Sequence, residues 1–488
     1  MKNRLLGFAA LGFVLIAFVL ALAPVVRAGG VDDKIQALEN ELGRLKSEQM
    51  ELKKEATAAA AALPDFSYRP GAGVTVQAAD KSWSFALSHE THWMMPFNEG
   101  KDRGGRTNGE VYGRRFRQEW TLCLNNCFYT WISRLDLDGF GTQTDLQRGM
   151  FEVHFEQVNP WLPTFYLGMD IPARVAPPFR QGSGATGAQM EYDLLSRNNG
   201  INTGRTGNGW GVVWEELPLI PALGIPGRGD LNFVVGCMGA CEDGGSAGTN
   251  KKSEMLYFRI DPFSRVKNPW ISGFSFAIAN VFCNNDSGTT MGCNRNRVQD
   301  HGPSGRQTLF DSGAASIVDS MQHWVMPGIQ WAYGPYTLRA VMGFMNYRDA
   351  DDNRGVDQKA RNFLIGHDLY VWSPKGLLTG SSRTPGSVLA GYHFERNNNS
   401  CGHTRDLAPC ASGNEFSRNR VIVNEWDLWY FFMSGKSLGI SILHYDASNL
   451  RSGAGQAQAT LLNKSPDQTR EGRGGDWVDV VLGLRVNF

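Results

Sequence analysis

Charged side chains recur at every second position in three short segments of this chain. They alternate with aromatic and aliphatic residues, and they are Arg115, Arg117 and Glu119, then Arg134 and Asp136, then Glu152, His154 and Glu156. Because neighbouring side chains of an extended strand point to opposite faces, each segment predicts one charged face. Such a face beside water sets a field that favours ions of one sign and orients polar solutes. These residues are therefore candidates for lining a transport path; the alternative for any one of them is that it only hydrates a wall.

The eight cysteines form four close pairs in the sequence. The pairs are Cys123 and Cys127, Cys237 and Cys241, Cys283 and Cys293, and Cys401 and Cys410. In an exported chain, an even number with local pairing predicts short disulfides that close loops, although the spacing leaves the connectivity open. A metal site would show CxxC pairs with accompanying histidines, and covalent haem would need CxxCH. The sequence has none of these motifs, so we expect no metal ion and no cofactor.

Motifs that resemble catalytic sites do not fit their context. His89 and His92 are three residues apart on an extended segment, whereas the zinc-protease motif places two histidines four apart on a helix. The string Gly435-Lys436-Ser437-Leu438-Gly439 has the form of a nucleophile elbow, but it lies on a predicted hairpin turn. We therefore expect no enzyme. A weak calcium candidate remains in one acidic loop, with Asp349, Asp351 and Asp352 as the oxygen ligands; a hydrated acidic loop is the alternative.

The N-terminal segment has the features of an export signal. Lys2 and Arg4 precede an apolar run from Leu5 to Ala23, and Val26-Arg27-Ala28 has the spacing of a cleavage site. We predict a signal peptide over residues 1–28, with an uncleaved membrane anchor as the alternative. Beyond Ala23 no stretch has the roughly 20 consecutive apolar residues of a membrane helix, which excludes a helical membrane protein.

Composition narrows the class of protein further. Without the three basic residues of that signal, 45 basic and 48 acidic residues remain, so the charge indicates no nucleic-acid partner. The 57 glycines and 14 tryptophans fit a protein with many turns and interfacial aromatic anchors better than a helical domain. Both an exported all-β protein and a transmembrane barrel satisfy these constraints.

A heptad pattern follows the signal. Val31, Ile35, Leu38, Leu42, Leu45 and Leu52 recur at steps of three and four residues, apart from Gln49. We predict a coiled-coil segment over residues 29–63, too short to be stable unless the subunits are also held together elsewhere. The alternative is one amphipathic helix packed on its own domain. Residues 64–80 are predicted to be a linker.

From residue 81 to 488 the hydrophobic period becomes two. Val480, Leu482 and Leu484 share one face near the end of the chain, opposite Asp479 and Arg485. We count sixteen strand candidates, near residues 83, 112, 128, 150, 164, 210, 230, 254, 270, 322, 336, 361, 388, 421, 437 and 477. Connections after odd-numbered strands are mostly long, and the others are mostly short. An even strand count with long loops at one rim predicts an all-β fold, a 16-stranded antiparallel transmembrane β-barrel.

The sequence resembles the phosphate-selective porin O and P family and the DcaP-type porins over most of its length. The likeness rests on the heptad segment and on three further segments: Arg114-Arg115-Phe116-Arg117, Phe165 to Met169, and Val480 to Phe488. The resemblance implies a sixteen-stranded homotrimer with a periplasmic trimeric coil. It also implies that residues 170–209 fold inward as a constriction loop, whose charged candidates are Arg174, Arg180, Glu191, Asp193, Arg197 and Arg205. This loop has no lysine, unlike the phosphate-selective members, so phosphate selectivity is not implied.

We therefore expect a porin of the outer membrane of a Gram-negative bacterium, with both termini in the periplasm. Small hydrophilic or ionic solutes would diffuse through it passively, and its partners would be those solutes, the lipid bilayer and two further copies of the chain. Two other functions remain open. One is an exported soluble β-protein that binds carbohydrate or a surface partner, and the other is a barrel sheath for an electron-transfer complex.

Overall fold

A computed structural model describes most of the strands and turns of the chain. The described residues are 31–62, 64–70, 72–98, 111–136, 145–169, 178–179, 206–238, 252–285, 297–299, 308–311, 320–349, 358–376, 384–400, 419–448 and 475–487. They belong to two compact units, Met1–Pro64 and Asp65–Phe488. The predicted signal peptide lies outside the described residues.

The first unit contains the helix α2 (Val31–Ala62), which confirms that the heptad segment is helical. Its apolar seam is exposed: Leu38 is 64% accessible and Leu42 is 53% accessible. Arg44 pairs with Glu41 at 2.5 Å and with Glu48 at 2.7 Å, one turn away on either side. Within the described part of the chain, no helix is long and apolar enough to cross a membrane.

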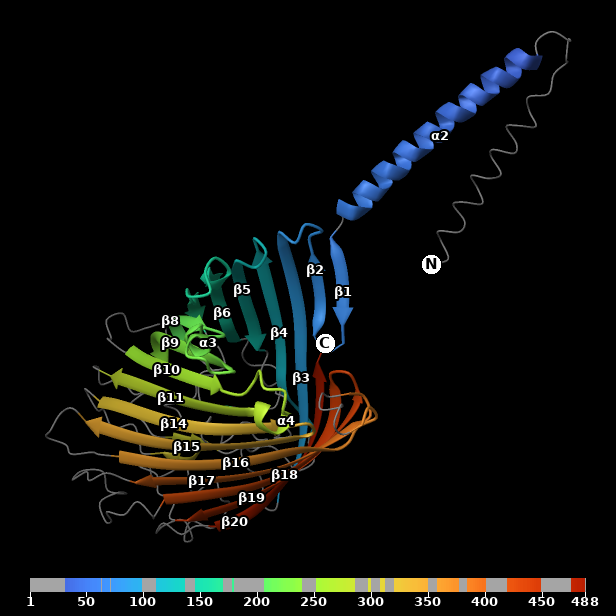
Figure 1. Cartoon of the computed structure of the whole chain (residues 1–488). Helices are drawn as coiled ribbons and strands as arrows, with labels where there is room; N and C mark the ends of the chain where they lie inside the picture. Colours follow the sequence, from blue (N-terminus) through green and yellow to red (C-terminus); the bar gives the residue numbers. More distant parts are fainter. Residues whose placement is uncertain are drawn as a thin grey trace. The chain divides into compact units, whose positions relative to one another are not determined.

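The second unit is a closed barrel of sixteen antiparallel strands (Figure 1). Each strand pairs with its neighbours in the chain, and β20 pairs with β3 to close the cylinder. The strands are β3 (Trp83–Asn98), β4 (Tyr112–Leu124), β5 (Tyr129–Asp136), β6 (Asp145–His154), β7 (Thr164–Met169), β8 (Thr206–Trp214), β9 (Arg228–Met238), β10 (Lys252–Asp261), β11 (Phe274–Asn285), β14 (Ser320–Tyr333), β15 (Tyr336–Asp349), β16 (Gln358–Trp372), β17 (Ser387–Ser400), β18 (Asn419–Met433), β19 (Lys436–Ser448) and β20 (Gly475–Asn487).

The predicted strand count is confirmed, with one local correction. The candidate near residue 270 falls on the short helix α4 (Pro269–Ser272), and β11 begins at Phe274. The Asn268 side chain accepts a hydrogen bond from the Trp270 amide at 3.0 Å, and Pro269 takes the first helical position. These two features favour a helical turn over an extended strand.

The linker expected at residues 64–80 instead contains a hairpin of β1 (Asp65–Arg69) and β2 (Gly73–Gln77). Strand β2 pairs with β3 from Val74 opposite Leu87, just beyond the point where β20 ends its own pairing with β3. Gly73 has a φ of +91°, and a Cβ there would lie 2.0 Å from the Leu87 carbonyl oxygen, so this close approach requires glycine. Two five-residue strands with two apolar positions each carry too little periodicity to be recognised in the sequence.

Short turns gather at one end of the barrel, as the spacing of the strands predicts. Among them are Asn125–Phe128, Gly334–Pro335 and Ser434–Gly435, which join β4 to β5, β14 to β15 and β18 to β19. Two other connections at this end carry the helical turns η1 (Phe155–Gln157) and α3 (Leu219–Ala222). The longer connections lie mostly outside the described residues, apart from the paired strands β12 (Arg297–Gln299) and β13 (Thr308–Asp311) and the pair Pro178–Phe179.

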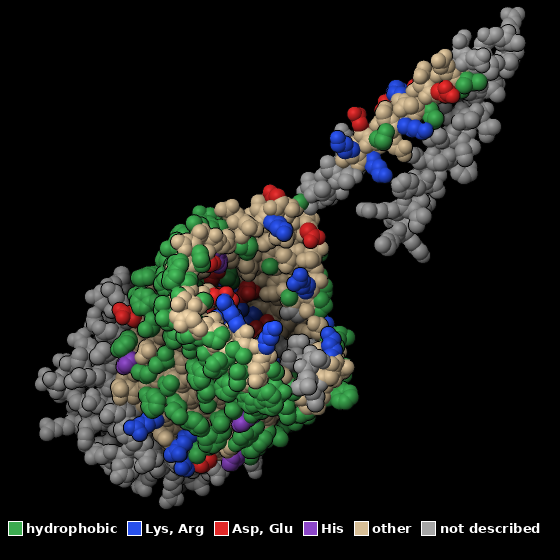
Figure 2. All heavy atoms as spheres, viewed as in Figure 1, with side chains coloured by type: hydrophobic (Ala, Val, Ile, Leu, Met, Phe, Trp, Pro, Cys, Tyr) green, Lys and Arg blue, Asp and Glu red, His purple; other side chains and the backbone are tan. Residues whose placement is uncertain are grey.

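The two faces of the barrel wall differ in side-chain type. On β16, Leu369 and Val371 point outward and are 41% and 45% exposed. Asp368, the residue before Leu369, points inward and is buried. Figure 2 shows hydrophobic side chains over the outside of the barrel, and acidic and basic side chains gathered in a hollow at one end. Aromatic residues mark the outer wall at the short-turn end, where the Trp270 and Tyr333 rings stack 3.8 Å apart. The outer wall is therefore mainly apolar, and charged side chains line part of the inner wall.

Candidate functional site

The charges predicted on alternate positions of β4 and β5 do meet on the inner wall. Arg117 lies opposite Glu90 of β3, and Glu119 lies opposite Arg134 of β5. Arg134 donates to Glu119 through Nε at 2.7 Å, and Arg148 of β6 reaches the same carboxylate at 3.5 Å. We call Glu90, Arg117, Glu119, Arg134 and Arg148 the charged sector. These side chains keep 12–26% of their surface accessible, so water reaches them.

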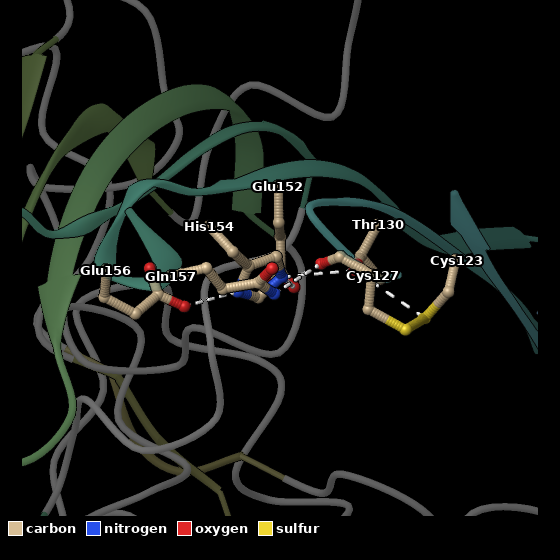
Figure 3. The surroundings of a disulfide bond; sticks show 7 residues. All are labelled: Cys123, Cys127, Thr130, Glu152, His154, Glu156 and Gln157. Carbon is tan, nitrogen blue, oxygen red and sulfur yellow. Dashed lines mark hydrogen bonds and ion pairs between the residues drawn. A yellow bond between two sulfur atoms is a disulfide. The ribbon is translucent and has the colours of Figure 1, made fainter. Parts of the chain in front are cut away.

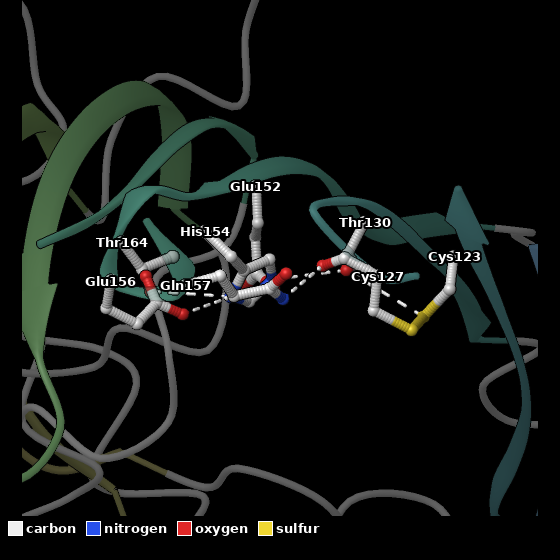
Figure 4. Close-up of polar contacts among 8 residues, drawn as sticks. All are labelled: Cys123, Cys127, Thr130, Glu152, His154, Glu156, Gln157 and Thr164. Carbon is white, nitrogen blue, oxygen red and sulfur yellow. Dashed lines mark hydrogen bonds and ion pairs between the residues drawn. A yellow bond between two sulfur atoms is a disulfide. The ribbon is translucent and has the colours of Figure 1, made fainter. Parts of the chain in front are cut away.

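A second polar group gathers around His154 at the end of β6 (Figure 4). Its Nδ1 lies 2.8 Å from Glu156 and its Nε2 lies 3.4 Å from Glu152, so two carboxylates flank one ring. Thr164 donates to Glu156 at 2.7 Å, and Thr130 lies 3.1 Å from Nε2. The three predicted residues on β6 and η1 therefore form one hydrogen-bonded group, which the charge pattern alone did not show.

Thr130 joins this group to the turn between β4 and β5, because its hydroxyl also lies 3.9 Å from the Cys123 sulfur (Figure 3). A disulfide joins Cys123 to Cys127 with a Cα–Cα distance of 4.4 Å. Asn125, Asn126 and Cys127 all have φ between 52° and 60°, a run of left-handed residues that favours asparagine and resists most other side chains. The Gln157 side chain donates to the Cys127 carbonyl at 3.1 Å and ties this turn to η1.

Sequence reasoning missed a polar cluster on the opposite part of the inner wall. Its members come from β15 to β18, and they are Arg339, Asp368, His393, Glu425 and Asp427. His393 lies at the centre, with Nε2 3.3 Å from Asp368 and 3.6 Å from Asp427. All five side chains are at most 6% exposed, so the interior is tightly filled at their level.

Arg339 connects this polar cluster to the connection between β7 and β8. Its Nη2 lies 3.3 Å from His393 Nδ1, and its Nη1 donates to the Phe179 carbonyl at 3.2 Å. Gly366 makes room for this contact, because a Cβ there would lie 2.7 Å from His393 Nδ1 and 2.8 Å from Arg339 Nε. Phe179 is therefore held on the inner wall, 160 positions away in sequence from the arginine that binds it.

Basic side chains also line the seam of the barrel. Arg115 of β4 and Arg485 of β20 both lie opposite His92 of β3, which places three basic residues in one row. The Arg485 guanidinium lies 3.7 Å from the centre of the Trp429 ring, within the range of a cation–π contact. The ring rests on Gly439, where a Cβ would come within 2.3 Å of it.

Another part of the inner wall is mainly apolar. Buried side chains from β6 to β16 form one hydrophobic cluster, which we call the apolar sector: Met150, Tyr166, Val234, Met255, Tyr257, Ala277, Ala279, Val281, Trp324, Met326, Val341, Met345, Ala360 and Leu364. Phe179 packs against it, and Pro178 and Phe179 both lie about Gly328, where a Cβ would be 3.0 Å from Pro178. One infolded pair of residues thus touches both the apolar sector and the polar cluster.

Several predicted residues lie outside the described part of the chain. They include the loop charges Arg174, Arg180, Glu191, Asp193, Arg197 and Arg205, the calcium candidates Asp351 and Asp352, and the disulfide candidates Cys241, Cys293, Cys401 and Cys410. The backbones of Asp136, Cys237, Cys283 and Asp349 lie in strands, but their side chains are not described. Among the described residues, no group of three or more His, Cys, Asp or Glu side chains could hold a metal ion.

The alternation of inward and outward positions along each strand could have revealed the missed residues. His393 alternates with Tyr392 and Phe394, which face outward, in the same way that Arg117 alternates with Phe116. The charge pattern is plain on β4, β5 and β6, where charged residues recur at alternate positions of one short segment. The pattern is weaker on β15 and β16, where Arg339 and Asp368 have no charged residue at the next inward position. On β18 it is as clear as on β4, since Glu425 and Asp427 are two residues apart.

No family model matches the chain, and no curated protein matches it. Solved structures with a similar backbone include OmpT, an outer membrane protein of Vibrio cholerae in a trimer form (9% identity, 83% of this chain and 100% of that chain, TM-score 0.49). Others are an anion-selective porin from Comamonas acidovorans (8%, 83% and 100%, 0.49) and the outer membrane channel DcaP of Acinetobacter baumannii (9%, 83% and 98%, 0.47). At such identities and scores the likeness decides nothing about function, and the barrel is established by its own strand pairing.

Proposed function

We propose that the chain is a porin of the outer membrane of a Gram-negative bacterium, through which small hydrophilic or ionic solutes diffuse passively. The observation that carries this proposal is the sorting of side chains by the barrel wall. A soluble barrel would place its charges outside, whereas here Glu119 and Arg134 pair inside while Leu369 and Val371 are exposed outside. An apolar outer wall and a wet inner wall are what a membrane channel requires.

The height of the apolar wall supports a membrane location. Outward positions of β16 between Arg361 and Trp372 are Phe363, Ile365, His367, Leu369 and Val371. His367 is the polar exception, and its Nδ1 is hydrogen-bonded to the Tyr336 hydroxyl. At ~3.3 Å per residue and ~40° of tilt, a ten-residue stretch rises about 25 Å, the height of the apolar band of outer-membrane barrels.

The proposed solute path follows the charged sector. Its carboxylates and guanidinium groups are partly accessible and carry both signs, so they can replace some of the hydration of a passing ion or dipole. Phe179, bound to Arg339, supports the proposal that residues 170–209 narrow this path. The loop charges Arg174, Arg180, Glu191, Asp193, Arg197 and Arg205 remain part of this proposal as constriction residues, together with Arg115, Asp136, Glu152, His154 and Glu156.

We further propose that the chain forms homotrimers and that residues 29–63 form a periplasmic coiled coil in them. The exposed seam of α2 supports this, because Ile35, Leu38 and Leu42 are 48–64% accessible in the single chain. Most of the stability of a helix in a protein comes from packing its apolar face against another element. Pairing its apolar seam with the same seam of other copies would bury these side chains.

A planar-bilayer recording of the purified chain tests the proposed function. We expect stepwise conductance, with steps in groups of three because three barrels insert together. Inserted, folded protein that carries no current would contradict the proposal.

The Leu38→Asp/Leu42→Asp variant tests the coiled coil separately. We expect it to weaken trimers in chemical cross-linking while each barrel still conducts, because the charged seam can no longer be buried. Glu39→Gln/Lys46→Gln, which changes the same helix outside the seam, is the matched control. Equal cross-linking of all three proteins would contradict the coil without affecting the channel.

A further inference from the structure

Three arginines lie on the outer wall of the barrel, at the long-connection end of neighbouring strands. Arg361 of β16, Arg396 of β17 and Arg420 of β18 all occupy outward positions, since their neighbours along the strands are buried inside. Arg361 and Arg396 are exposed, and the Arg420 side chain is 35% accessible. We call these three residues the outer arginine cluster.

The strand register brings the cluster together. Asn398 of β17 lies opposite Arg361 on one side and opposite Arg420 on the other. Since adjacent strands are ~4.8 Å apart, the backbones of these two arginines are separated by about 10 Å. Arg396 lies two residues from Asn398 on the same face, and its Nε donates to the Asn398 side chain at 3.3 Å. The flexible arginine side chains can therefore converge on one group bound between them.

The charge of this patch is positive. Arg420 pairs with Asp446 of β19 at 3.1 Å, which offsets one of the three charges. Asp446 lies opposite Ile422 on β18, two residues from Ser448, which lies opposite Arg420. The described side chains of this patch are therefore three guanidinium groups and one carboxylate, on a wall that is mainly apolar.

The cluster also lies at a definite height on that wall. Apolar outward side chains adjoin the cluster in register, because Phe344 lies opposite Arg361, and Arg396 lies between Phe363 and Ile422. At the short-turn end, outward positions of β16, β18 and β19 are Val371, Tyr430 and Leu438, which are apolar or aromatic. Charge is costly in the apolar band and is tolerated at its edge, so the cluster marks the boundary between acyl chains and headgroups on one side of the membrane.

We propose that the outer arginine cluster binds the phosphate group of a lipid headgroup in the leaflet at the long-connection end of the barrel. Guanidinium groups bind phosphate through paired hydrogen bonds, and several of them around one anion give both charge and geometry. The adjoining apolar side chains of Phe344, Phe363 and Ile422 would then contact the acyl chains of the same lipid. This inference rests on the proposed membrane location, but not on conduction.

Native mass spectrometry of the full chain in detergent, with added phosphatidic acid or phosphatidylcholine, tests the inference. We expect tighter binding of phosphatidic acid, because its phosphomonoester carries more negative charge. Each single Arg→Gln change should weaken that binding about fivefold, and Arg361→Gln/Arg396→Gln/Arg420→Gln should weaken it on the order of 100-fold. The matched control is Arg265→Gln/Lys267→Gln/Lys375→Gln, which removes the same charge from exposed turns at the other end of the barrel. This control variant should bind phosphatidic acid as tightly as the original chain does.

Three outcomes would overturn the inference. They are equal binding of the two lipids, equal loss in the control variant, and displacement of phosphatidic acid by inorganic phosphate at the same concentration, which would indicate a site for free anions. If the triple variant does not fold, the single variant Arg396→Gln decides, because its side chain is exposed and its removal leaves the strand pairing intact. A chain that binds phosphatidic acid but carries no current would contradict the proposed channel and leave the lipid site standing.

Discussion

The charged sector and the apolar sector line the same barrel interior but have opposite character. In the charged sector, Glu119 and Arg134 are ion-paired yet 24–26% accessible. In the apolar sector, Val234, Met255 and Trp324 are fully buried although they also point inward. An inward position is therefore not equivalent to a wet position. One side of the interior contacts water, and on the other side the inward side chains pack against residues such as Phe179.

A buried charge in the apolar sector is expected to give the largest effect. Met255 is 0% exposed, so Met255→Lys places an ammonium group among apolar side chains and should lower the free energy of unfolding by about 3–5 kcal/mol. Thr121→Lys, on the inward face beside Glu119, should change it by less than about 1 kcal/mol. Urea titration followed by tryptophan fluorescence measures both. Equal losses would mean that the two sectors do not differ in hydration.

Removing the link between the polar cluster and Phe179, which packs against the apolar sector, should have the next largest effect. Arg339→Ala breaks the hydrogen bonds to Phe179 and His393, which should cost about 1.5–3 kcal/mol, as for bonds to a charged group. Gly366→Ala should act in the same direction, because its Cβ would displace both Arg339 and His393. Single-channel conductance should rise in both variants as Phe179 loses its anchor. Unchanged conductance in both would show that this contact does not restrict the path.

Two glycines lie against inward aromatic rings on different parts of the wall. Replacing each glycine by alanine tests how tightly that part of the wall is packed. A Cβ at Gly211 would lie 2.2 Å from the Tyr166 hydroxyl, in the apolar sector, and one at Gly439 would lie 2.3 Å from the Trp429 ring. We expect each Gly→Ala change to cost about 1–3 kcal/mol through overpacking. Gly43→Ala in α2 meets no atom within 4 Å and is the control. A loss at only one ring in thermal unfolding would show that the other ring can move.

Neutralising one charge of the charged sector should affect stability least and ion selectivity most. Because the pair is partly exposed, Glu119→Gln should change the free energy of unfolding by less than about 1 kcal/mol. It should shift the reversal potential in a salt gradient toward anion preference, and Arg134→Gln should shift it toward cation preference. Arg265→Gln, in an exposed turn, is the control. Shifts of the same sign for the two variants would place the conducting path elsewhere.

The sequence predicts the in-and-out alternation of the wall because that alternation is a local property of each strand. Arg115, Arg117 and Glu119 were correctly assigned to one face, and the sixteen strands follow from the same period. Whether an inward face is wet depends on what lies against it from elsewhere in the chain. The contact of Arg339 with Phe179 spans 160 positions and leaves no local signal in either segment. The pairing of Glu119 with both Arg134 and Arg148 likewise requires the strand register, which the period alone does not give.

The seam between β3 and β20 has a consequence for how this protein is made. Residues 479–487 of β20 pair with residues 90–98 of β3, so the first barrel strand to be synthesised needs the last barrel strand as its neighbour. Until then both strands expose unpaired backbone amides and carbonyls, the kind of edge that recruits other chains into aggregates. A nascent chain that has not yet reached β20 therefore depends on assistance to keep β3 from pairing wrongly. A chain truncated before β20 cannot close the barrel and stays dependent on that assistance.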